Sequence, residues 1–155
     1  MERGVKDLYT EIARNTENPD TAKILRILAA ESEAHAKVLE LRYGTFGNPA
    51  SMDEGVKGLL SLLGERIRKI KRKIEPSLVL QEGIEIEKYM EELYKGLADN
   101  YKMEAQVMKS LGKEQKDASK IGEIFDRISS DERRHRDILE KHASQMLKEG
   151  AIREV

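Results

Sequence analysis

The 155-residue sequence predicts an all-α protein, a four-helix bundle built from two helical hairpins that a helical crossover joins. Three observations predict this class. Apolar residues recur at spacings of three and four along most of the chain, and no segment shows the alternation of a strand. Turn-forming residues divide the chain into helix-length segments. The first half of the chain is partly repeated in the second half.

The helices are predicted from their ends as well as from their apolar faces. A first helix over 2–14 ends in "NTENPD", where Pro19 suits the first turn of a second helix over 19–43. After the loop "YGTFGNPAS", Ser51 and Glu54 form a capping box for a third helix over 52–74.

Pro76 interrupts the chain again and Gly112 marks the next turn, so the last two helices are expected over 77–111 and 114–148. We therefore expect one domain rather than two. Its parts are hairpin 2–43, crossover 44–76 and hairpin 77–148, within a single domain over 1–155.

Two pairs of segments show that the hairpins share one design. "ERGVKDLYTEIA" (2–13) aligns with "EKYMEELYKGLA" (87–98), and "AKILRILAAESEAHAKVLE" (22–40) aligns with "GEIFDRISSDERRHRDILE" (122–140). An insertion between the two segments of the second hairpin lengthens its tip by about two turns in each arm. This tip has no counterpart to pack on, so we expect a homodimer that buries its apolar residues, which are Tyr101, Ala105, Met108 and Leu111.

Polar residues occupy positions on the apolar faces of these helices. Glu132 and His135 lie within the apolar stripe of the last helix, and His35 lies within that of the second. Glu87 falls on the apolar face of the fourth helix, and Glu2 is its counterpart in the repeat. Buried carboxylates without partners are costly, and a bound cation removes that cost. The pattern therefore predicts a metal site.

The segments "EKYMEELYKGLA" and "DERRHRDIL", and more loosely "EAHAKVLEL", resemble the ferritin-like superfamily, and within it the rubrerythrin-like diiron-carboxylate proteins without a rubredoxin module. This resemblance implies a ferritin-like bundle around two iron ions, with manganese or zinc as alternatives. It implies reaction with hydrogen peroxide, dioxygen or ferrous iron. The ligands it implies are Glu2, His35, Glu87, Glu132 and His135.

One position departs from the family pattern, because Ser32 stands where the first hairpin should carry the counterpart of Glu132. Glu31, four residues before His35, could coordinate in its place or remain outside the site. Tyr94 and Tyr9 could hydrogen-bond the ligands or be core aromatics.

Five further polar positions near the expected site have less specific interpretations. Glu91 could be an additional ligand, although a surface role is favoured, and His142 is interpreted as structural or partly exposed. The arginines of "SSDERRHRDIL" are expected to lie in solvent.

The composition limits the remaining function classes. The net charge of −1 gives no reason to expect nucleic acid, and the longest apolar run, "LLSLL", is too short to span a membrane. With no signal segment, the cytoplasm is the expected location. No cysteine is present, so a redox-active centre needs an external electron donor protein. The oxidant expected for such a centre is a small molecule.

Three functions remain open. We expect a diiron peroxidase or ferroxidase with no catalytic residues beyond the metal ligands. Ser32 would favour metal sequestration with little turnover, and a degenerate scaffold without metal is the third possibility.

Overall fold

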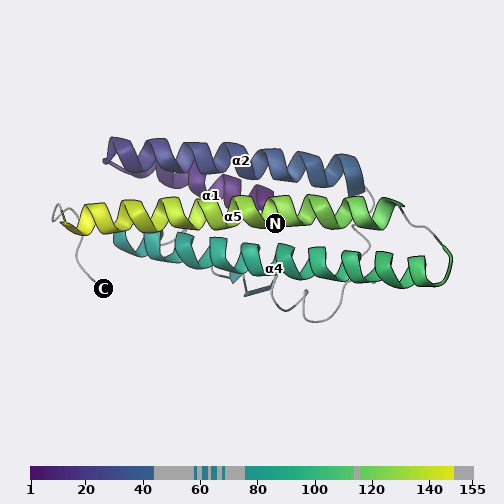
Figure 1. Ribbon diagram of the computed structural model, residues 1–155. Helices are drawn as coiled ribbons and strands as arrows, with labels where there is room; N and C mark the ends of the chain where they lie inside the picture. Colours follow the sequence, from purple (N-terminus) through teal and green to yellow (C-terminus); the bar gives the residue numbers. More distant parts are fainter. Residues whose placement is uncertain are drawn as a thin grey trace.

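The computed structural model describes residues 1–43, 76–113 and 116–148, together with single positions 58, 61, 62, 64, 65 and 68. The long helices of this part of the chain are α1 (Glu2–Asn15), α2 (Pro19–Tyr43), α4 (Pro76–Ser110) and α5 (Lys116–Lys148). Helix α1 packs on α2, α4 packs on α5, and the two hairpins meet along α2 and α5 (Figure 1). The predicted all-α bundle is confirmed. The expected crossover helix over 52–74 falls mostly outside the described residues, and its described single positions are helical.

Local hydrogen bonds explain where α2 begins and where α4 ends. The Asn18 side-chain oxygen accepts a hydrogen bond from the Thr21 backbone N–H at 2.9 Å, which caps α2 just before Pro19. At the end of α4, Gly112 takes a φ of 72°, and the N–H of Lys113 donates to the carbonyl of Met108 at 2.9 Å. Gly112 also donates to the Lys109 carbonyl at 3.0 Å, which completes a Schellman motif.

The core runs along the inside of both hairpins. Helices α4 and α5 approach closely at Gly122, where an added Cβ would lie 3.2 Å from the carbonyl oxygen of Ala98. Fully buried side chains from every long helix form one apolar cluster. It includes Val5, Leu8, Leu25, Leu28, Ile86, Met90, Ile128 and Leu139. This cluster encloses the polar residues described below.

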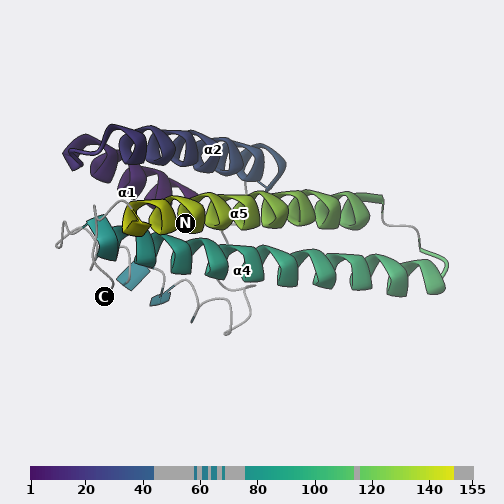
Figure 2. The same cartoon turned by 60° about the vertical axis from the view of Figure 1, so that its left-hand side comes forward.

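The two hairpins point in opposite directions, and α4 and α5 extend well past the end of α2 in both views (Figures 1 and 2). On this extension Met103, Val107 and Leu111 follow one another at intervals of four residues and are 60%, 52% and 65% exposed. Tyr101 and Met108, two of the residues expected at the tip surface, are only half-exposed. Within the described ranges, no helix is long and apolar enough to cross a membrane.

Candidate metal centre

Five polar residues meet in the middle of the bundle. They come from all four described long helices: Glu2 from α1, His35 from α2, Glu87 from α4, and Glu132 and His135 from α5. None of the five is more than 7% exposed. The structure therefore brings together five of the six residues that the sequence analysis assigned to a metal site. Glu31 is the exception.

These residues form two groups that share Glu132. In one group the Nδ1 atom of His35 lies 2.8 Å from Oε1 of Glu132 and 3.9 Å from Oε1 of Glu2. In the other, Nδ1 of His135 lies 3.2 Å from Oε2 of Glu132 and 3.4 Å from Oε2 of Glu87. Within each group the potential ligand atoms all lie within 4.8 Å of one another. Glu132 thus offers one oxygen to each side, as a bridging carboxylate would.

Several atoms of the cluster have no hydrogen-bond partner among the described residues. They are Oε2 of Glu2, Nδ1 of His35, Oε2 of Glu87 and Oε1 of Glu132. Although His35 Nδ1 and Glu132 Oε1 are close, the two atoms do not meet at hydrogen-bonding angles. Buried polar atoms are otherwise almost always paired, and a cation bound between the groups would use these free lone pairs. Carboxylate oxygens and imidazole nitrogens are donors that suit iron, manganese and zinc.

Two tyrosines connect the hairpins in a reciprocal way. Tyr9 of the first hairpin donates a hydrogen bond to Oε1 of Glu87 in the second. Tyr94 of the second hairpin donates to Oε1 of Glu2 in the first, at 2.5 Å. Burial raises the pKa of both phenols well above their ordinary value, so each remains a neutral donor. Glu87 therefore has Oε1 held by Tyr9 and Oε2 directed toward His135. In Glu2 the oxygen held by Tyr94 is also the one nearest His35, and Oε2 has no hydrogen-bond partner among the described residues.

Two further carboxylates hold the outer nitrogens of the histidines. Oε2 of Glu31 lies 2.5 Å from Nε2 of His135, and Oδ2 of Asp131 lies 3.2 Å from Nε2 of His35. Arg134 contacts both carboxylates, with Glu31 at 2.9 Å and Asp131 at 3.2 Å. A histidine that donates its Nε2–H to a carboxylate keeps the Nδ1 lone pair for a metal. Both imidazoles are thereby oriented with Nδ1 toward the shared Glu132.

The cluster holds protons when no cation is bound. Burial and the nearby Glu132 carboxylate raise the pKa of Glu2 to about 7, and burial raises the pKa of Glu87 to about 8. Burial opposes protonation of His135, but the Glu132 and Glu87 carboxylates raise its pKa to about 11. Burial alone would also raise the pKa of Glu132, yet the neighbouring imidazoles hold it far below its ordinary value. Charge in this core is therefore balanced by protons that a cation could replace.

Ser32 does not supply the missing fourth carboxylate, and Glu31 does not occupy its place. The Ser32 hydroxyl is buried and donates to the Leu28 carbonyl at 3.1 Å, as serines inside helices often do. Glu31 contacts His135 from the outside and belongs to neither group. Asp131 is its counterpart in the repeat, and that correspondence was the signal in the sequence that could have identified both as partners of the histidines.

Two other polar residues differ from or refine the sequence interpretation. The favoured surface role for Glu91 is wrong, because the residue is 8% exposed and pairs with Arg133 at 2.7 Å and Arg136 at 2.5 Å. It does not belong to either candidate group. His142 is buried, with its Nε2 2.6 Å from the Thr21 hydroxyl.

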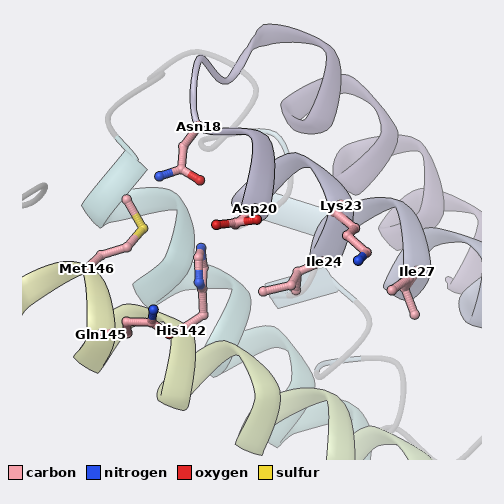
Figure 3. A pocket seen from close by; sticks show the side chains of 8 residues that line it. All are labelled: Asn18, Asp20, Lys23, Ile24, Ile27, His142, Gln145 and Met146. Carbon is pink, nitrogen blue, oxygen red and sulfur yellow. The ribbon is translucent and has the colours of Figure 1, made fainter. Parts of the chain in front are cut away.

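Among the residues that the structure describes, α2 and α5 line a cavity at each of two places. The larger, of about 310 Å³, lies where α2 begins and α5 ends, away from the cluster (Figure 3). In the close-up, His142 and Met146 face Asp20 and Asn18 across it (Figure 3). The second, of about 280 Å³, reaches His35 and Asp131. Its other lining residues are both charged and apolar: Glu31, Arg127, Arg134, Ala34, Val38, Ile124 and Ile128. It leads from the surface to the side of the cluster on which the outer carboxylates lie.

A family model described as Rubrerythrin matches residues 1–143. No curated protein matches the chain. No solved structure matches it either.

Proposed function

The chain belongs to the rubrerythrin family, and on that premise we propose that it is a dinuclear metal oxidoreductase that reduces hydrogen peroxide with two iron ions. The proposed ligands are Glu2, His35, Glu87, Glu132 and His135. One observation carries the proposal. Two groups of buried ligand atoms share Glu132, and four of those atoms have no partner in the described part of the chain. Iron bound there would supply the two electrons that convert peroxide to water.

The side chains of the cluster have separate tasks in this proposal. Glu132 holds the two halves of the site together, while Glu2 and Glu87 each complete one half. Tyr9 and Tyr94 keep those two carboxylates in place through hydrogen bonds that leave the second oxygen free. The apolar shell around the cluster excludes bulk water, and the cavity beside His35 gives a small oxidant a way to approach.

Two assignments follow from the contacts of the outer residues. Glu31 and Asp131 are proposed to orient the imidazoles rather than to bind metal, because each lies at Nε2 of a histidine.

Electrons for a new cycle must come from outside these 155 residues, since they contain no cysteine to hold a redox iron. A separate electron donor protein is therefore part of the proposal.

Iron analysis and peroxide consumption test the function together. Protein reconstituted with ferrous iron under anaerobic conditions should hold two ions per chain and consume peroxide. A Glu132→Ala variant should lose both properties, because both groups need that carboxylate. A wild-type chain that binds no iron, or binds iron without consuming peroxide, would overturn the proposal.

Metal sequestration is the second candidate, and Ser32 is the observation that favours it. The structure offers three carboxylates to the two groups, and the buried hydroxyl at position 32 adds no fourth charge. A site with fewer anionic ligands stabilises ferric iron less than a site with four carboxylates would. Oxidation of the bound iron, which turnover requires, is then less favourable. Iron that stays bound through repeated additions of peroxide and reductant without turnover would favour this candidate.

We also propose that the chain forms a homodimer through the extension of α4. Met103, Val107 and Leu111 make an exposed apolar stripe there, and a second copy offers the same stripe in return. Light scattering of the wild type should give twice the mass of the chain, and Val107→Glu should give the monomer mass. A monomeric wild type at tens of micromolar would contradict this.

A further inference from the structure

Three aromatic rings form a column that begins at the candidate metal centre. The Tyr94 and Phe125 rings stack with their centroids 5.9 Å apart and an angle of 20° between their planes. The Phe125 and Tyr101 rings stack at 5.7 Å and 22°. Both distances lie in the range over which aromatic rings interact directly. At the inner end, the Tyr94 hydroxyl donates a hydrogen bond to Glu2, one of the proposed ligands.

The two ends of the column lie in different surroundings. Tyr94 is 2% exposed and Phe125 is 7% exposed, so the inner two rings are shielded from solvent. Tyr101 is half-buried and lies two turns further along α4, on the side of Gly112. The column thus leads from a buried carboxylate to the surface. It has a phenol, which can be oxidised, at each end.

We propose that this aromatic column carries oxidising equivalents from the metal centre to the surface at Tyr101. The inference rests on the proposed function, because an oxidant must react at the centre. It applies when the site holds one ferrous ion rather than two. Reduction of hydrogen peroxide to two water molecules requires two electrons and two protons, and one ferrous ion supplies only one of those electrons.

The second electron comes from the column. Tyr94 gives up an electron to the reaction and its phenolic proton to the Glu2 carboxylate. Tyr101 then returns an electron to Tyr94 across the Phe125 ring, while Glu2 returns the proton. Tyr101 releases its own proton to water. In sum, the O–O bond of peroxide breaks and two water molecules form. Of the two protons that this requires, one is balanced by the proton that Tyr101 releases and the other is a net uptake from solvent. One ferrous ion and one Tyr101 phenol are oxidised.

The device would keep a reactive oxidant from attacking the buried ligands. A radical on Tyr94 would lie within hydrogen-bonding distance of Glu2, in the middle of the core. A radical on Tyr101 lies at the surface, where a reductant or a second phenol can reach it. Transfer to Tyr101 therefore moves the damage away from the site.

The experiment loads the full chain with one ferrous ion, mixes it anaerobically with hydrogen peroxide, and freezes samples for electron paramagnetic resonance. Remaining peroxide and dityrosine fluorescence are measured on the same mixture. Wild-type protein should consume peroxide, show a tyrosyl radical and form dityrosine. Tyr101→Phe and Phe125→Leu should consume peroxide but lose the dityrosine, because the radical stays on Tyr94. Tyr89→Phe, on the same helix but outside the three stacked rings, is the matched control and should behave as wild type.

The outcomes separate the inference from the proposed function. Peroxide consumption by the wild type without a tyrosyl radical overturns the inference alone, as does dityrosine in Tyr101→Phe equal to that of wild type. A wild type that reacts with peroxide when loaded with two ferrous ions but not with one also overturns the inference alone. A wild type that leaves peroxide unreacted with two ferrous ions overturns both. Tyr101→Phe removes one hydroxyl from a half-exposed position, so it remains a valid test even where Phe125→Leu lowers stability.

Discussion

Replacing Glu31 by glutamine distinguishes a metal ligand from a residue that orients one. Glu31 lies 2.5 Å from Nε2 of His135, and both of its oxygens are bound by Arg134, at 3.3 and 2.9 Å. Glutamine keeps an acceptor of the same length but removes the charge that makes His135 a stronger base. The metal stoichiometry should therefore stay at two ions per chain while the affinity falls.

The size of this effect follows from the position of Glu31. Loss of a residue that orients a ligand typically lowers metal affinity by about 10–100-fold, or about 1.4–2.8 kcal/mol. The Glu31 side chain is 32% exposed, so solvent screens its charge and we expect the lower end, about tenfold. Glu31→Ala also removes the acceptor and should approach the upper end, about a hundredfold.

Titration with cobalt(II), followed by its visible absorption and by competition with a chelating dye, measures stoichiometry and affinity together. Glu33→Gln is the matched control, because Glu33 lies on the same helix and contacts Lys37 and Lys6 instead of a histidine. It should leave both quantities unchanged. A Glu31→Gln variant that binds one ion instead of two would show that Glu31 is a ligand, and an unchanged affinity would show that its contact with His135 has no effect on binding.

Four further predictions concern stability and metal binding. Metal at about 100 times its dissociation constant should stabilise the fold by about 2.7 kcal/mol and raise the melting temperature by about 5–10 °C; a melting curve that chelator does not shift would contradict this. Glu87 (pKa about 8) and His135 (pKa about 11) hold protons at neutral pH, so metal binding should release protons and its affinity should fall as the pH falls. Calorimetry in buffers of different ionisation enthalpy measures the number of protons released. An affinity that does not change with pH would argue against these ligands. Ser32→Glu should lower the melting temperature of the metal-free chain, where it buries another charge, and raise that of the metal-bound chain, so shifts of the same sign would refute the placement of Ser32 beside the site. Gly122→Ala should cost about 1–3 kcal/mol in urea denaturation, because its Cβ would press on the Ala98 carbonyl; unchanged stability would mean that the helices are further apart than described.

The helices of this protein could be predicted because their signals are local. Pro19 and Gly112 stand where the structure begins α2 and ends α4, and the cap from Asn18 lies within the same turn as Pro19. The apolar spacing identified the buried face of each helix, and the repeat showed which polar residues on those faces belong together. His35 and His135 could be paired in this way, and the structure stacks their rings 5.9 Å apart.

The rest depended on how the helices are rotated against one another. On a helical wheel Glu31 and Ser32 flank the apolar stripe of α2 about equally, so only the packing of α2 on α5 decides which of them faces the cluster. The same holds for Glu91, whose burial requires Arg133 and Arg136 from α5 to lie opposite it. The partners of the tyrosines also belong to the other hairpin, and no sequence spacing relates them.

The reciprocal tyrosine contacts have a consequence for the origin of this chain. Tyr9 and Glu2 are the repeat counterparts of Tyr94 and Glu87, and each tyrosine binds the glutamate of the other hairpin. A single ancestral hairpin carrying one such tyrosine and one such glutamate could not form this contact within itself. Two copies of it related by a twofold axis would form the contact twice. Duplication and fusion of that gene would then preserve the pairing while freeing each half to change, and Ser32 is a position where the two halves differ.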